Sequence, residues 1–284
     1  MMSRLSSVAE RHQIITFFVL TYALAWTLES PLAFLRDSIT DTQGLVLTIL
    51  ASNVPSVLGI VLTAIVLGRG ALRKLLGRLL IWRVEPRWYL VVVLGPVALA
   101  GGAVGLNALL GGPTLSLGMP LLGVAVFLAF SIFSGSALGE EIGWRGYALP
   151  RLQAGGSALD VSLILGPIWA LWHLPLWLTG TPGRTASLYA AFVVSVIALS
   201  VILTWVYNST GGSLLLVVLL HATFNLPMTL AMEQLGSRAT VPLLLYWGLL
   251  VVAAIVAVIV AGPKHLSPAQ EAGGASRGAR GRYA

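Results

Sequence analysis

Hydrophobic residues along this chain fall into eight long runs, separated by short polar or basic stretches. Each run reaches about 20 residues, the length that an α-helix needs to cross the hydrocarbon core of a bilayer. Backbone polar groups inside lipid must be paired within their own segment, so the runs predict helices and not an open sheet. The expected spans are residues 13–35, 44–68, 88–110, 119–146, 158–178, 185–207, 212–232 and 239–261.

The composition favours the same architecture. The chain has 284 residues, of which 57% are hydrophobic and only 10% are charged, whereas about a quarter of the residues in a soluble domain are charged. We therefore expect an all-α fold, a polytopic transmembrane bundle with about eight spans, built as a single domain over residues 1–263. The chain contains no cysteine, which excludes disulfides and a thiol nucleophile.

The positions of the basic residues predict the orientation. If both termini are cytoplasmic, fourteen of the 17 Lys and Arg residues lie on the cytoplasmic side, and only Arg36, Arg184 and Arg238 lie outside. An excess of positive charge on the inner side is the general rule for such proteins. We predict a multi-pass protein of the cell membrane with both termini cytoplasmic.

The net charge of +7 points to membrane lipids as partners and not to nucleic acid, because the basic residues lie between apolar runs, beside the head groups. The basic and partly apolar stretch 71–87 predicts an interfacial helix on the inner leaflet. Residues 264–284 are rich in Gly, Ala, Ser and Arg, which predicts a disordered cytoplasmic tail.

Ionisable side chains within membrane spans are costly and usually functional, and here they gather in three motifs. At a rise of 1.5 Å per residue, their key side chains lie about 14–20 Å from the cytoplasmic ends of three different spans. This common depth predicts one shared site that opens toward the cytoplasm. The motifs are Glu140-Glu141-xxx-Arg145, Trp169-xxx-His173 and His221-xxx-Asn225.

The two neighbouring glutamates are predicted to have different roles. Glu141 and Arg145 are four residues apart, so they share a helix face and can pair. A carboxylate held by a guanidinium is stabilised as the anion, which makes it a poor proton acceptor. Glu140 is rotated by about 100° from Glu141 and has no partner on its own helix. We therefore expect Glu140 to be the general base and Glu141 to be a supporting residue.

Several peptidase chemistries can be tested against these residues. The zinc motif HExxH is absent, and the spans contain no pair of buried aspartates for an aspartic dyad. A Ser–His dyad through Ser136 remains conceivable, but this serine lies one helical turn from Glu140 and could simply line the cavity. The chemistry that fits best is a carboxylate and an imidazole that activate water.

The three motifs resemble the signature of the CPBP family, the intramembrane endopeptidases related to the CaaX prenyl proteases. That signature combines EExxxR, an aromatic-xxx-His motif and His-xxx-Asn or His-xxx-Asp, and the resemblance covers roughly residues 119–230. It extends to Thr210-Gly211-Gly212-Ser213 before the third motif. Trp169 stands where the family usually has Phe, from which we expect a changed pocket shape and no loss of chemistry.

The resemblance implies an intramembrane endopeptidase that hydrolyses a peptide bond. It implies that Glu140 and His173 activate the water and that His221 and Asn225 stabilise the oxyanion, while the ion pair of the first motif holds that motif in place. The substrate would be a membrane-associated or lipidated peptide or protein. No cofactor is expected, although Glu140, His173 and His221 could ligate zinc.

A non-proteolytic function is the alternative. Intramembrane acidic and histidine residues also serve proton relays, so the chain could be a proton-coupled transporter or an adaptor of the bacteriocin-immunity type. A transporter is expected to show inverted repeats or paired broken helices, and the sequence shows neither. Proteolysis of a reporter by the purified protein distinguishes these functions.

Overall fold

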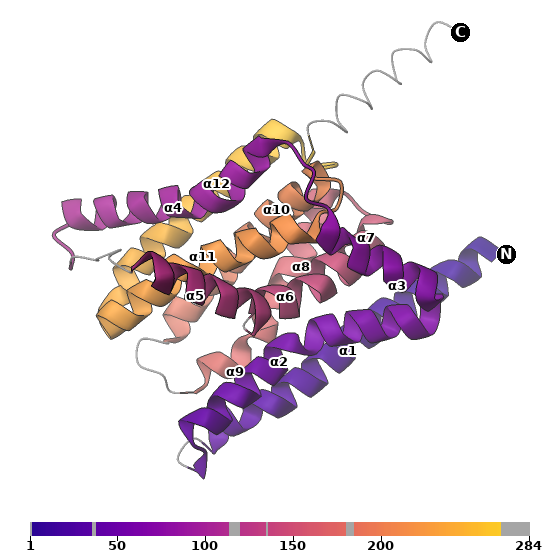
Figure 1. The fold of residues 1–284 in the computed structure, drawn as a ribbon, viewed down its shortest axis with the longest axis horizontal. Helices are drawn as coiled ribbons and strands as arrows, with labels where there is room; N and C mark the ends of the chain where they lie inside the picture. The colour runs from indigo at the N-terminus through magenta and orange to yellow at the C-terminus, as the bar shows by residue number, and fades with distance from the viewer. Residues whose placement is uncertain (1, 36–37, 114–119, 135, 180–184, 268–284) are drawn as a thin grey trace, which may run out of the picture.

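The computed structural model describes residues 2–35, 38–113, 120–134, 136–179 and 185–267, with side chains from residue 12 onward. Within these residues the chain is helical, without a strand (Figure 1). The helices are α1 (Met2–Phe34), α2 (Asp41–Leu62), the π-helix η2 (Thr63–Leu67), α3 (Gly68–Gly77), the 3-10 helix η3 (Arg78–Leu80), α4 (Pro86–Leu109), α5 (Leu121–Phe133), α6 (Ser136–Glu141), the π-helix η4 (Ile142–Ala148), α7 (Leu149–Gln153), α8 (Ala158–Trp172), α9 (Leu174–Trp177), α10 (Ala186–Ser209), α11 (Leu214–Leu235), the 3-10 helix η5 (Gly236–Ala239) and α12 (Thr240–Ala261).

The predicted polytopic helical bundle is confirmed, and the protein is a multi-pass membrane protein. Six helical runs of the described chain are long and apolar enough to cross a membrane: His12–Phe34, Asp41–Leu80, Pro86–Leu109, Leu121–Gln153, Ala186–Ser209 and Leu214–Ala261. Two features account for the difference from eight spans. The predicted fifth span contains the shorter apolar helix Ala158–Trp172, and the run Leu214–Ala261 contains both of the predicted last spans, as the separate helices α11 and α12 joined by η5.

The long helices follow the long axis of the molecule, so the bundle has two distinct ends (Figure 1). We call the end that carries the start of α1, α3, α7 and the segment after α12 the basic end. The opposite end carries the α1–α2 connection, α9 and η5, and we call it the turn end. Contacts support this arrangement: the amide of Ala158, at the start of α8, donates to the carbonyl of Lys264, which follows α12 (2.9 Å).

The stretch 71–87, predicted to be an interfacial helix, is helical only in its first part. The chain turns from η2 into α3 at Gly68, whose φ of 78° suits glycine. Helical structure ends at Leu80 instead of continuing to residue 87. The next long helix starts at Pro86, and a proline disfavours helical geometry at the residue before it. Leu75 of α3 is buried.

The predicted disordered tail begins too early. The carbonyls of Pro263 and Lys264 accept hydrogen bonds from the first amides of α8, which have no partner within their own helix. Leu266 and Ser267 are buried as well. Residues 268–284 of the predicted tail lie outside the described residues, as do Arg36 and Arg184 of the predicted outer loops.

Candidate active site

The first motif is held against α2 by close contact between two backbones. A Cβ atom on Gly139 would lie 2.7 Å from the carbonyl oxygen of Ser52, and one on Gly143 would lie 2.4 Å from that of Pro55. The hydroxyl of Ser56 donates to a carbonyl of α6 (2.8 Å) and accepts from the amide of Gly143 (3.3 Å). Glycine permits this approach because it lacks a Cβ, and the result is a fixed position for the glutamates between the two glycines.

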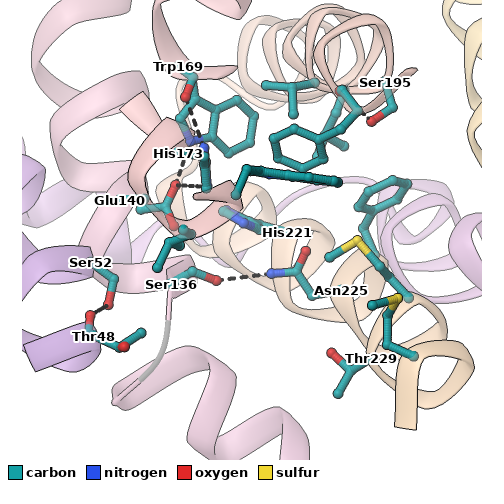
Figure 2. Close-up of a pocket in the computed structure, with 18 of the residues that line it drawn as sticks. Thr48, Ser52, Ser136, Glu140, Trp169, His173, Ser195, His221, Asn225 and Thr229 are labelled. Atoms are coloured by element: carbon teal, nitrogen blue, oxygen red, sulfur yellow. Dashed lines mark hydrogen bonds and ion pairs between the residues drawn. The ribbon is translucent and has the colours of Figure 1, made fainter. Parts of the chain in front are cut away.

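Glu140 projects into the bundle and is only 1% exposed. Its partner comes from another helix: the indole N–H of Trp169 donates to Glu140 Oε2 over 2.5 Å. The same oxygen lies 4.0 Å from His173 Nε2. Figure 2 shows the three side chains converging on one point. The structure therefore brings together the carboxylate and the imidazole that were expected from the sequence to act together.

His173 lies where α8 ends, which differs from the predicted unbroken span 158–178. The helix stops at Trp172, and the short helix α9 follows. Pro175 is two residues further on, and a proline disfavours continuation of a helix through the residue before it. The break leaves the imidazole at the wall of the cavity, where Nδ1 lies 2.9 Å from the carbonyl oxygen of Trp169.

Glu141 is the centre of a second buried cluster. Its Oε1 accepts from Arg145 Nη1 at 3.0 Å and lies 2.7 Å from His221 Nδ1. Glu141 and Arg145 are both completely buried. The predicted ion pair is therefore present, and it also holds a histidine that the sequence places in a different motif. The guanidinium of Arg145 stacks 4.2 Å from the ring centre of Trp169, which links this cluster to Glu140.

Asn225 lies one turn beyond His221 on α11. Its Nδ2 donates to the hydroxyl of Ser136 over 2.9 Å (Figure 2). This contact identifies Ser136 as a residue that orients the amide, a function that the sequence alone does not reveal. The signal in the sequence was its position one helical turn before Glu140, from which we expected it to line the cavity.

A cavity of about 700 Å³ joins these residues. Glu140, His173, His221 and Asn225 all line it, together with Trp169 and Ser136, and the rest of its lining is mostly apolar. The depths of these four side chains along separate helices were therefore enough to predict that they converge. Glu141 and Arg145 are absent from the lining, which agrees with a supporting position behind the wall.

The cavity extends from these residues toward the turn end of the bundle. Its lining from α2 is confined to Leu45–Ser52, its lining from α10 to Leu188–Leu199, and its lining from α12 to Leu243 and Trp247. Each of these stretches lies in the part of its helix nearer the turn end. Toward the basic end, Trp144 and Tyr147 are completely buried.

The side chains suggested as zinc ligands do not fit a metal site. Among the described residues, no group of three His, Asp or Glu side chains is arranged to hold a metal ion. One oxygen of Glu140 already accepts the indole N–H of Trp169.

Comparisons with known proteins agree with the family resemblance predicted from the three motifs. Residues 120–227, which contain all three motifs, match the family described as "Type II CAAX prenyl endopeptidase Rce1-like". A protein named "CAAX prenyl protease 2" from Methanococcus maripaludis is 32% identical over 93 residues, which are 31% of this chain and 34% of that protein. The predicted resemblance is confirmed for the motif region, and the chain matches about a third of the length of this relative.

Proposed function

We propose that this protein is an intramembrane endopeptidase that hydrolyses peptide bonds of membrane-associated substrates with a water activated by Glu140 and His173. The observation that carries the proposal is the 4.0 Å separation between Glu140 Oε2 and His173 Nε2 at the wall of a cavity. Both residues lie in the region that matches the CAAX endopeptidase family.

The separation suits a bridging water. Nδ1 of His173 faces a backbone carbonyl, so a neutral ring carries its proton there and presents Nε2 as an acceptor. A water oxygen about 2.8 Å from each acceptor would subtend an angle of about 90° between them, close to the angle between its own O–H bonds. Such a water donates to both groups, and the carboxylate can take its proton as the oxygen attacks the scissile carbonyl.

In this proposal His221 and Asn225 stabilise the oxyanion that the attack creates. Nδ1 of His221 faces Glu141, so Nε2 is the ring atom available to substrate, and it donates only when the ring is an imidazolium. The carboxylate of Glu141 stabilises that positive charge. Asn225 uses one of its two N–H groups for Ser136 and retains the other for the oxyanion.

The direct test is hydrolysis of a quenched fluorescent membrane peptide by the purified protein in liposomes, with mass spectrometry of the products. We expect His173→Ala to lower kcat by about 100-fold or more, because general acid–base groups contribute about 10²–10⁴-fold. The exposed His12 provides the matched control, and His12→Ala should retain the wild-type rate. Failure of the wild-type protein to cleave any peptide of a diverse set would contradict the proposal.

Treatment with a chelator tests the proposed absence of a metal. We expect EDTA to leave the cleavage rate unchanged, because no group of three His, Asp or Glu side chains among the described residues is arranged to hold a metal. The measurement is the rate before and after dialysis against the chelator. Loss of activity that zinc restores would contradict this reading of the site.

Trp169 is proposed to position Glu140. Trp169→Phe keeps an aromatic ring and removes only the N–H that donates to the carboxylate. We expect kcat to fall about 10–100-fold with little change in KM, because a hydrogen bond to a charged group contributes about 1.5–3 kcal/mol. Trp177→Phe alters another indole of the cavity wall and should change KM more than kcat. An unchanged kcat in the Trp169→Phe variant would contradict the proposal that Trp169 positions Glu140.

A further inference from the structure

Three hydroxyl side chains recur at four-residue spacing along one face of α2. They belong to Thr48, Ser52 and Ser56, and residues four apart lie one above the other on a helix. Thr48 and Ser52 donate to carbonyls of α2 itself (2.9 and 2.7 Å), whereas Ser56 donates to the carbonyl of Leu138 in α6 (2.8 Å). A hydroxyl that donates its hydrogen keeps lone pairs with which it can accept a second hydrogen bond.

Ser56 shows what such an oxygen can bind. It accepts the backbone N–H of Gly143 over 3.3 Å, so it pairs with an amide of the chain segment that lies against α2. Thr48 and Ser52 continue the same helix face, but both line the cavity. Their hydrogen bonds stay within α2 over the described chain. Each of these two oxygens can therefore accept an N–H from a molecule that occupies the cavity.

This part of α2 lies beside the proposed base. A Cβ atom on Gly139, the residue before Glu140, would lie 2.7 Å from the carbonyl oxygen of Ser52. Figure 2 shows Thr48 and Ser52 at the side of the pocket that also carries Ser136 and Glu140. Thr48 lies one helical turn closer than Ser52 to the start of α2, which is at the turn end. A peptide bond presented to Glu140 therefore has this face of α2 as its neighbour.

The spacing of the two hydroxyls fits an extended peptide. Four residues of α-helix rise about 6 Å, and the N–H groups along one edge of an extended chain are about 6.6–6.8 Å apart. The fit matters because a backbone N–H that enters an apolar cavity without an acceptor is costly to desolvate. The cavity lining is mostly apolar. A peptide that lies extended along α2 regains an acceptor at every second residue.

We infer that the hydroxyl pair Thr48 and Ser52 binds two alternate backbone N–H groups of an extended peptide substrate and holds that peptide along α2 with its scissile bond at Glu140. The inference rests on the proposed function, because the peptide is the substrate of that reaction. The hydroxyls bind the backbone and not the side chains, so they fix the conformation and register of the substrate without selecting its sequence. Their loss should raise KM more than it lowers kcat.

Replacing single amides of the substrate by esters tests the inference. An ester has an oxygen in place of the N–H, so it removes one donor and keeps the length of the chain. Each peptide of the series carries one ester, at successive positions around the cleaved bond but not at that bond. The protein variants are Thr48→Val and Ser52→Ala. Thr27→Val is the matched control, because its hydroxyl also donates to its own helix (2.6 Å) but is exposed and does not line the cavity.

We expect two ester positions, two residues apart, to lower kcat/KM of the wild-type protein about twofold to tenfold, the range of one net hydrogen bond. Thr48→Val should be insensitive to one of these esters and Ser52→Ala to the other, whereas Thr27→Val should respond like the wild type. The same sensitivity of the wild type and both cavity variants to every ester would overturn the inference.

Binding of the same peptides to the Glu140→Gln variant, which lacks the proposed base, separates this inference from the proposed function. The measurement is the Kd of each peptide, with and without the hydroxyl substitutions. The expected ester pattern in Kd, together with no cleavage by the wild-type protein, would support the binding role of the hydroxyl pair and remove the peptidase. Cleavage by the wild-type protein without that pattern would leave the peptidase standing and overturn the binding role.

Discussion

The Glu140→Gln variant is expected to fold like the wild-type protein and to hydrolyse peptide about 10²–10⁴-fold more slowly, the usual contribution of a general base. Glutamine has almost the same shape as glutamate, and its side-chain oxygen can still accept the indole N–H of Trp169. The amide cannot take a proton from water. Only the proton-transfer step is removed, so kcat should fall while substrate binding and the melting temperature in detergent stay close to wild type.

Glu29 provides the matched control for this experiment. It is a second glutamate that lines the same cavity, and it is 1% exposed, as is Glu140. Glu29→Gln therefore removes an equally buried carboxylate without touching the Glu140–His173 pair. Both variants should be compared by kcat, KM and melting temperature. If Glu29→Gln abolished cleavage and Glu140→Gln retained it, the assignment of Glu140 as the general base would be wrong.

The position of the site along the chain could be predicted because polar groups in a membrane span are rare and costly. Glu140, His173, His221 and Asn225 interrupt otherwise apolar runs, and the helical rise places them at comparable depths. Each span supplies its own residues independently. Their convergence in one cavity then follows from bundle packing, which confines buried polar side chains to a common interior.

The contacts between motifs could not be predicted, because they depend on how one helix is rotated against another. Spacing shows that Glu141 and Arg145 can pair within one helix. It contains no information on whether the same carboxylate reaches His221, 80 residues later. The hydrogen bond from Trp169 to Glu140 is the second example. From sequence this tryptophan differs from phenylalanine only in size, although its N–H defines the position of the base.

The direction in which the cavity extends and the break in the helix at His173 could also not be predicted from the sequence pattern. An apolar run such as 158–178 has the same hydrophobicity whether the helix continues or ends before Pro175. Likewise, the apolar residues that line a cavity are indistinguishable in sequence from those that face lipid. Only the arrangement of the helices shows that the cavity extends toward the turn end of the bundle.

Arg145→Met is expected to destabilise the protein by about 3–5 kcal/mol, the usual cost of leaving one partner of a buried ion pair alone. Glu141 is completely buried, and the loss of Arg145 Nη1 leaves its carboxylate with His221 as the remaining hydrogen-bond partner in the described chain. Glu141→Gln leaves the guanidinium without its anion and should destabilise the fold by a comparable amount. Melting temperatures in detergent measure both effects.

The double variant Glu141→Gln/Arg145→Met distinguishes stability from catalysis. It removes both members of the ion pair, so it should be less destabilised than the sum of the two single variants. Its activity should nevertheless remain low, because His221 still lacks the carboxylate that orients its ring and stabilises the imidazolium. We therefore expect the double variant to recover most of its melting temperature without recovering kcat. If activity returned together with stability, Glu141 would act on the fold alone and His221 would not depend on it.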